Sequence, residues 1–137
     1  MMIIPIDDFV KITQLTINKS KFSASPGNIR ILKRKISSAQ KVTTVKIPSD
    51  IIIMNSIIDF KCENSDLNFS IKLVCPEDEN IKEKRISIFS SLGTAIYLHR
   101  VGDIIKYLTW KKENIIRILK VSFNSESSNS FLQENKQ

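Results

Sequence analysis

The hydrophobic pattern changes its period near residue 50, and this change most constrains how the chain can fold. Before it, apolar residues recur every three or four positions, and after it they alternate with polar residues in several short runs. One segment inside the second part, about 92–99, has helical character. Because the apolar face of a sheet needs a cover, the sequence predicts an α+β fold, a short helical hairpin followed by an antiparallel sheet with one short helix.

The N-terminal part contains two segments with helical spacing, at about 7–18 and 29–41. Their predicted apolar stripes are Phe9, Ile12 and Leu15 on the first helix and Ile29, Leu32, Ile36 and Ala39 on the second. Asp7 or Asp8 is expected to cap the first helix. A polar connector, 18–28, would join the two into an antiparallel hairpin. With about twelve residues per arm, the hairpin would be only ~18 Å long.

The second part is predicted to contain five strands and one helix. The strands are expected at about 51–62, 67–74, 85–89, 104–110 and 115–123, with a bulge near Asn55 and Ser56 in the first. Ser90 or Ser91 would cap the helix. The predicted organisation is therefore a hairpin at 1–47, a sheet domain at 48–123 and a frayed Ser/Asn/Glu-rich tail at 124–137.

The positive charge of the chain is concentrated near its beginning. The net charge is +7, and residues 1–50 hold nine Lys and Arg against three Asp and Glu. Four of these cations lie on the second predicted helix, at Arg30, Lys33, Arg34 and Lys35. They form a candidate basic contact face, either for an acidic protein surface or for weak, non-specific contact with nucleic acid. The alternative is a solvated helix face.

Several function classes are disfavoured by composition. Cys62 and Cys75 match no zinc spacing and there is a single His, so no metal site is expected. No cofactor, small-molecule substrate or catalytic cluster is indicated, and the protein is predicted not to be an enzyme. No apolar run reaches the ~18 residues of a membrane span, and the first residues do not resemble a signal peptide, so a cytoplasmic location is expected.

Four short motifs carry a resemblance to a known family. They are Met-Asn-Ser at 54–56, Pro-Glu-Asp at 76–78, Ser-Ser-Leu-Gly at 90–93 and Val-Gly-Asp at 101–103. In this order the chain resembles the C-terminal domain of the Gre-type bacterial transcription factors, GreA and GreB, and especially their Rnk branch, the regulators of nucleoside diphosphate kinase. The resemblance implies an FKBP-like domain, a bent antiparallel sheet cradling one short helix. It also implies a non-enzymatic partner of bacterial RNA polymerase.

The resemblance further implies which residues would contact the polymerase. In the family, the loop that opens the short helix has a Ser-Pro-Leu-Gly pattern and docks at the rim of the polymerase secondary channel. The matching residues are Ser90, Ser91, Leu92 and Gly93, with Ser91 in place of the family Pro. The alternative interpretation is that the serines only cap the helix and that Leu92 belongs to the core, and the two interpretations are compatible.

The hairpin connector separates this chain from the cleavage factors of the family. Those factors carry a long coiled coil with two acidic residues at its tip, which help to hold the catalytic magnesium of the polymerase. The corresponding segment here, 18–28, contains no Asp or Glu and two Lys. The sequence therefore predicts a regulator that docks at the channel rim without stimulating transcript cleavage. The alternatives are a GreA/GreB-like cleavage factor and a basic nucleic-acid-binding module.

Overall fold

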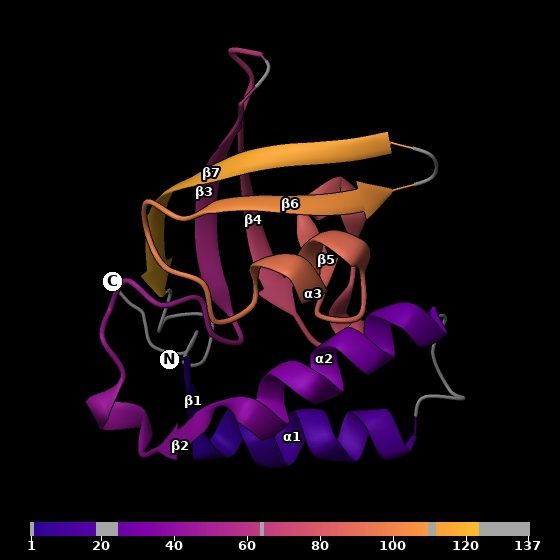
Figure 1. Ribbon diagram of the computed structural model, residues 1–137, viewed down its shortest axis with the longest axis vertical. Coiled ribbons are helices and arrows are strands. Elements are labelled where there is room, and N and C mark those ends of the chain that lie inside the picture. The colour runs from indigo at the N-terminus through magenta and orange to yellow at the C-terminus, as the bar shows by residue number, and fades with distance from the viewer. Residues whose placement is uncertain (1, 19–24, 64, 110–111, 124–137) are drawn as a thin grey trace, which may run out of the picture.

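The structure, a computed structural model, describes residues 2–18, 25–63, 65–109 and 112–123. A pair of helices lies along one side of a curled sheet, and a short third helix lies between this pair and the sheet (Figure 1). This arrangement confirms the predicted α+β fold with N-terminal helices. The predicted tail, 124–137, lies outside the described residues, as does most of the connector between the two helices.

The hairpin consists of α1, Ile6–Ile17, and α2, Pro26–Ser38. The chain runs along α1 and returns beside it along α2 (Figure 1). The buried apolar side chains of the two helices are Ile12 and Leu15 on α1 and Ile29, Leu32 and Ile36 on α2. They belong to one hydrophobic cluster that continues into the sheet. The hairpin is therefore packed against the rest of the protein rather than held only by its own helix pair.

Three details of the hairpin differ from the prediction. Helix α2 begins at Pro26 and ends at Ser38, three residues earlier at each end than the predicted 29–41, because a short strand takes up the chain from Gln40. Strands β1, Ile3–Pro5, and β2, Gln40–Val42, pair in parallel beside the helices. They were not predicted, because strands of three residues are too short to show a period of two. A 3₁₀ turn, η2, Thr44–Lys46, follows them. The predicted cap of α1 is also wrong: Pro5 is its N-cap residue, and no side chain bonds to the free N–H groups there.

Among the described residues, the sheet contains five strands in the order β5-β4-β3-β7-β6. Their bounds are Ser56–Cys62 for β3, Asn68–Val74 for β4, Arg85–Ser87 for β5, Ile104–Thr109 for β6 and Lys112–Phe123 for β7. All neighbours are antiparallel except β4 and β5, which are parallel. The prediction of a wholly antiparallel sheet is wrong for that pair. Two 3₁₀ turns, η3 at Pro76–Asp78 and η4 at Ile81–Glu83, lie between β4 and β5 and allow the chain to re-enter in the same direction.

Residues 51–55 do not extend β3 as the alternation suggested. Ile51 makes only an isolated bridge to Arg100, and β3 begins at Ser56. Asn55 has a φ of 72°, a left-handed conformation that turns the chain. The phase shift there is thus a turn, whereas the bulge lies further along, between Asp59 and Phe60 opposite β7.

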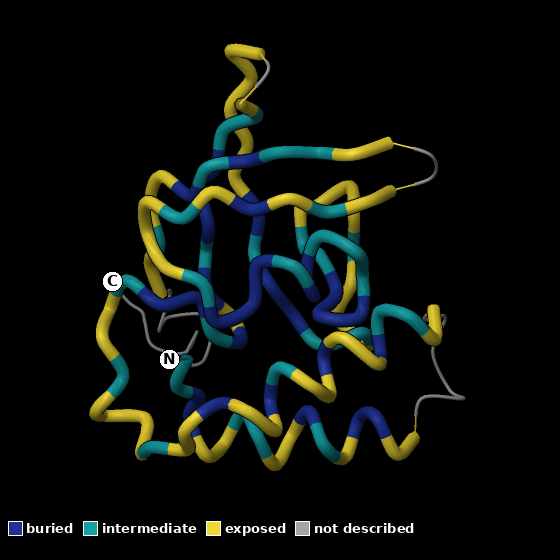
Figure 2. The backbone as a smooth tube through the Cα atoms, viewed as in Figure 1, coloured by how far each residue is buried: buried dark blue, intermediate teal, exposed yellow. Residues whose placement is uncertain are grey.

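The short helix α3, Ser91–Ile96, covers the inner face of the curled sheet. Buried residues of α3, β3 and β7 belong to one hydrophobic cluster, and Figure 2 shows buried segments in each of the three elements. Among the side chains with no more than 1% exposure are Ile58, Ile96, Tyr97, Ile116 and Ile118. The helix ends three residues earlier than predicted, and Leu98 takes a φ of 71° just after it. No helix among the described residues is long and apolar enough to span a bilayer.

Candidate partner-docking site

The segment that opens α3 is fixed by its own polar groups. Ser90 Oγ accepts a hydrogen bond from the Gly93 N–H at 2.9 Å and donates one to the Ser87 carbonyl at 2.7 Å. Ser90 is thus the N-cap, one of the two serines that the sequence predicted for this role. A Cβ atom at Gly93 would collide with the Ser87 carbonyl oxygen, so only glycine allows α3 to pack this closely on β5. The opening of α3 is therefore a rigid turn of defined shape.

The four residues singled out by sequence are brought together here but differ in exposure. Ser90, Ser91 and Leu92 are half-buried, whereas Gly93 is buried. Leu92 packs against the edge of the core. Ser91 Oγ accepts a hydrogen bond from Asn28 Nδ2 of α2 at 3.3 Å. The side chains of Ser91 and Leu92 therefore reach the surface, whereas Gly93 determines the shape of the turn.

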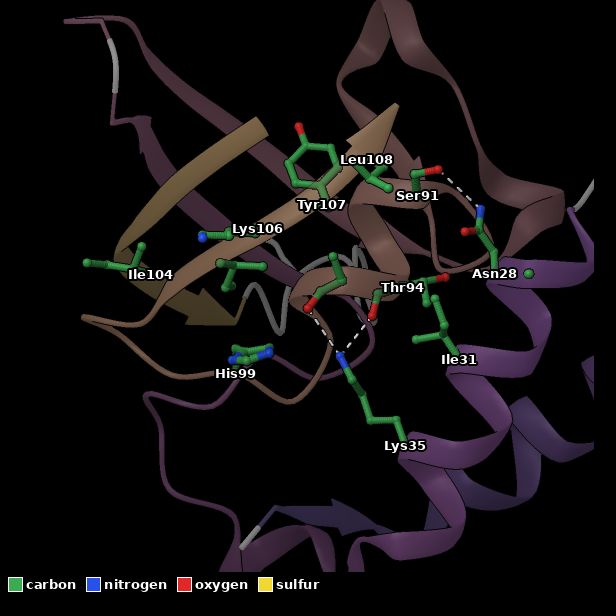
Figure 3. Close-up of a pocket in the computed structure, with 13 residues that line it drawn as sticks. Asn28, Ile31, Lys35, Ser91, Thr94, His99, Ile104, Lys106, Tyr107 and Leu108 are labelled. Carbon is green, nitrogen blue, oxygen red and sulfur yellow. Dashed lines mark hydrogen bonds between the residues drawn. The ribbon is translucent and has the colours of Figure 1, made fainter. Parts of the chain in front are cut away.

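Helix α2 holds α3 at both of its ends (Figure 3). Asn28 Nδ2 donates to the Phe89 carbonyl at 3.1 Å, just before α3 begins. At the other end, the Lys35 ammonium donates to the carbonyl oxygens of Thr94, Ala95 and Tyr97 at 2.8, 3.1 and 2.9 Å. Asn28 and Lys35 are two helical turns apart, ~10.5 Å, which matches the ~9 Å length of a six-residue helix. A cation is also favoured at a helix C-terminus.

Lys35 therefore does not belong to the exposed basic face that the sequence predicted. It is half-buried beside α3, and burial lowers the pKa of its ammonium to about 8. A projection of α2 at ~100° per residue reveals the difference. Lys35 lies about 60° from the buried Leu32, whereas Arg30 and Arg34 lie about 160° from it. The sequence thus contains the helical spacing that separates Lys35 from the other cations, but a count of cations does not reveal it.

Arg30, Lys33 and Arg34 form the basic face that remains, and we call these three residues the basic face of α2. All three side chains are exposed. Within the described part of the chain, no acidic side chain forms an ion pair with them. The face is therefore exposed to solvent.

Asp8 and Lys35 together hold Tyr97, which follows α3. The Asp8 carboxylate accepts hydrogen bonds from the Tyr97 hydroxyl at 2.7 Å and from the Met54 N–H at 3.0 Å. Burial raises the pKa of Asp8 and raises that of the Tyr97 phenol well above its usual range. Because α1 binds the hydroxyl and α2 binds the carbonyl of Tyr97, we call Asp8, Lys35 and Tyr97 the Tyr97 clamp. No sequence pattern indicates this clamp, because an Asp at the start of a helix usually acts as a cap.

A groove of about 610 Å³ lies beside α3, between α2 and β6 (Figure 3). Its walls include Ile31 and Lys35 of α2, Ala95 of α3, and Ile104, Lys106 and Leu108 of β6. No Asp or Glu is among the described residues that line it. His99 lies at one end, where its Nδ1 is 2.8 Å from Asp103 Oδ2 and burial lowers its pKa. His99 lies beyond the end of α3, so it does not sit on the helix as predicted.

The helical hairpin, the curled sheet and its short covering helix define an FKBP-like α+β protein with an N-terminal helix pair. The family model described as "Transcription elongation factor, GreA/GreB, C-term" matches residues 47–123, which is more than half of the chain. The protein therefore belongs to the GreA/GreB family.

Individual relatives are distant in sequence but similar in fold. The transcription elongation factor GreA of Buchnera aphidicola subsp. Baizongia pistaciae is 26% identical over 99 residues, which are 72% of this chain and 62% of that relative. The chain thus spans less than two thirds of that protein's length. The prokaryotic transcription elongation factor GreA/GreB from Nitrosomonas europaea matches with a TM-score of 0.74 and 26% identity, covering 89% of this chain and 98% of that one. Thermus aquaticus Gfh1, at 21% identity, a TM-score of 0.50 and coverage of 85% and 83%, shows similarity of fold alone.

Proposed function

We propose that this protein is a cytoplasmic, non-enzymatic regulator that binds bacterial RNA polymerase at the rim of its secondary channel, in the manner of the Rnk branch, without stimulating transcript cleavage. One observation carries the proposal: the connector of the hairpin, 18–28, contains no Asp or Glu. Magnesium is bound by oxygen ligands, chiefly carboxylates. A connector with Lys19 and Lys21 instead has no acidic group to offer a catalytic metal.

The short hairpin supports the same proposal. Helices α1 and α2 contain 12 and 13 residues, so each extends only ~18–20 Å. Both are anchored to the sheet side of the molecule through the shared core and the Tyr97 clamp. We propose that the hairpin, 1–47, occupies the channel entrance while the domain at 48–123 makes the main contact.

The proposed polymerase contact is the opening of α3. Ser91 and Leu92 are half-buried side chains on a turn that Ser90 and Gly93 hold rigid. A rigid turn loses little conformational entropy when a partner binds, which favours affinity. This supports Ser90, Ser91, Leu92 and Gly93 as the docking residues.

A cleavage assay on backtracked polymerase complexes tests the proposal. We expect this protein to leave the intrinsic cleavage rate unchanged, and at excess to reduce the cleavage stimulated by an added GreA, because the two would compete for one entrance. Stimulation of cleavage by the protein alone would support the GreA/GreB-like alternative and overturn the proposal.

The docking residues are tested separately, by measuring binding of core polymerase to Leu92→Ala. Leu67→Ala is the matched control, because Leu67 is 61% exposed and lies at the turn between β3 and β4. We expect Leu92→Ala to weaken binding several-fold, as truncation of a contact residue does, and the control to have no effect. Equal binding by both variants, with melting temperatures unchanged, would place the contact elsewhere.

Nucleic-acid binding is a second candidate, favoured by the exposed basic face of α2. Three phosphate contacts would give a slope of about −3 in a plot of log K against log salt concentration on bare duplex DNA. Exchange of Arg30, Lys33 and Arg34 for Gln should then abolish binding. A slope near zero, or no binding without polymerase, would exclude this candidate.

A further inference from the structure

Strand β6 is an edge strand with a free side. It stands last in the sheet order and pairs only with β7, over Ile104–Thr109. Within the described residues, no main-chain hydrogen bond joins β6 to any segment other than β7. In an antiparallel pair, alternate residues direct their N–H and C=O groups away from the partner strand. The free side of β6 therefore presents unpaired main-chain groups, which are a template for an added strand.

The groove beside α3 follows this free side. Five consecutive residues of β6, 104–108, line it, and α2 and α3 form its other walls (Figure 3). Consecutive residues of a strand point to opposite faces of the sheet, so they line one groove together only where the groove runs along the strand's edge. The groove is thus placed to hold an extended chain against β6.

The two faces of β6 offer different chemistry along that edge. Ile105 is buried and Tyr107 is half-buried on one face, whereas Ile104, Lys106 and Leu108 are exposed on the other. Across the groove, Ile31 of α2 is 50% exposed. An extended segment with alternating apolar and acidic side chains would place apolar groups toward α2 and α3 and acidic groups beside Lys106.

The position of Lys106 argues against pairing between two copies of this chain. Lys106 is the central residue of 104–108, so antiparallel pairing of two β6 edges about that centre would set Lys106 opposite Lys106. Like charges directly opposite one another destabilise a strand pair, and an edge lysine is a common protection against self-association. A carboxylate at the same position would be attracted, and none of the described residues that line the groove carries a carboxylate to compete with it.

We infer that the groove between α2 and β6 receives an extended, acidic segment of a partner protein, which adds a strand to β6 and places a Glu or Asp opposite Lys106. The groove extends as far as Ser91 in the α3 opening, but the strand-adding contact lies along β6 and does not depend on polymerase binding. Main-chain hydrogen bonds give the affinity, and the alternation of side chains gives the selectivity.

The test uses the full chain and a fluorescent, end-capped peptide of alternating residues, Val-Glu-Val-Glu-Val-Glu-Val. Binding is followed by fluorescence anisotropy at low salt, and amide hydrogen exchange is followed by NMR. We expect saturable binding, with slowed exchange at every second amide of β6 and unchanged exchange at the amides already bonded to β7. A peptide with Lys in place of Glu, and one with Pro at the two inner Val positions, should not bind.

Charge reversal separates this site from general attraction to a basic protein. Lys106→Glu should weaken binding of the Glu peptide about fivefold to tenfold and allow the Lys peptide to bind. Lys46→Glu is the matched control, because Lys46 is exposed, lies outside the groove and gives the same change in net charge. The control should bind both peptides as the unaltered chain does, and melting curves verify that both variants fold.

Four results would overturn the inference. They are absence of peptide binding, equal weakening by Lys106→Glu and Lys46→Glu, equal binding of the Pro-containing peptide, and exchange protection outside β6. Sedimentation of the protein alone provides a further check. If the protein forms a dimer, and if Lys106→Glu alters that dimer whereas Lys46→Glu does not, a second copy occupies the groove and the inference is wrong.

Discussion

The interior of the sheet and the junction between hairpin and α3 are stabilised by different forces. Inside the sheet, fully or almost fully buried Ile58, Ile116 and Ile118 contribute by removing apolar surface from water, an effect that has no preferred direction. At the junction, Asn28, Lys35 and Asp8 form hydrogen bonds with defined partners at 2.7–3.3 Å.

This difference separates stability from orientation. Apolar packing tolerates small rotations of the packed elements, whereas hydrogen bonds weaken steeply when their geometry changes. The sheet interior should therefore supply most of the free energy of folding. The Tyr97 clamp should instead set the angle at which the hairpin lies against the sheet. Its gain in stability should be smaller, because its polar groups give up hydrogen bonds to water when they form hydrogen bonds with each other.

The largest expected effect comes from the sheet interior. Ile116→Ala removes a side chain of 0% exposure on β7, so we expect unfolding to become easier by about 2–5 kcal/mol. Val45→Ala, at a residue that is 91% exposed, should change stability by less than about 0.5 kcal/mol. Urea denaturation followed by circular dichroism measures both. A loss below about 1 kcal/mol at Ile116 would mean that the sheet interior is not the main source of stability.

A smaller but more directed effect is expected at Lys35. Lys35→Met keeps the length of the side chain and leaves three carbonyl oxygens without the ammonium, which should cost about 1–3 kcal/mol. The substitution should also speed the hydrogen exchange of α2 amides more than that of β3 amides, because the hairpin loses its hydrogen bonds to α3. Lys33→Met, on the exposed side of the same helix, is the control and should change neither quantity. Equal behaviour of the two variants would argue against an orienting role for Lys35.

The parts of this fold that the sequence reveals are those set by local periodicity. The stripe at Ile29, Leu32 and Ile36 predicted α2. A serine cap at 90 or 91 with a helix after it was also correct, apart from the early end of α3, because capping is a contact between near neighbours. The parallel pairing of β5 with β4 was missed, since strand direction depends on the path of the chain through 76–84 rather than on the strand's own residues.

Long-range polar contacts were the hardest to predict. Asp8 and Tyr97 are 89 positions apart, and neither residue type implies the other. Lys35 was placed with Arg30, Lys33 and Arg34 because charge counting ignores helical phase, although a projection of α2 separates it from them. The connector chemistry, by contrast, required only the sequence: the absence of acids at 18–28 is a fact of composition.

The charge on Asp8 gives a pH-dependent test of the junction. Burial raises the pKa of Asp8 above its usual 3.8, so the folded state holds the proton at a pH where the unfolded state has lost it. The stabilisation from that proton is complete below pH 3.8 and is lost as pH rises through the folded pKa.

Asp8→Asn keeps an acceptor for the Tyr97 hydroxyl and removes the charge. As pH rises through the same window, the stability of this variant should therefore increase relative to that of the unaltered chain. Urea midpoints between pH 3.5 and 7 measure the difference, with Asp66→Asn, at an exposed residue whose charge does not act on Asp8, as the control. A difference that is flat with pH, or of opposite sign, would contradict a raised pKa at Asp8.

The smallest expected effect concerns the N-terminal end of α3. Ser91 is the first helical residue, a position where proline is well tolerated because its fixed φ suits the helix and the N–H is free. Ser91→Pro would lose the 3.3 Å contact with Asn28, yet Asn28 would keep its 3.1 Å bond to the Phe89 carbonyl. We therefore expect a net stabilisation of about 0.4–1 kcal/mol from the restricted unfolded chain, measured by urea denaturation.

Ser91→Ala serves as the control for this substitution, because it removes the same hydroxyl without fixing φ. If Ser91→Pro destabilises the protein while Ser91→Ala does not, the proline ring itself is excluded by the packing of α2 on the turn. If both destabilise equally, the Asn28 contact contributes to the junction as the Lys35 contacts do. Stabilisation by proline alone would instead mean that α2 holds α3 mainly at its C-terminal end, where the Lys35 ammonium meets three carbonyls, and that the opening turn is left available to a partner.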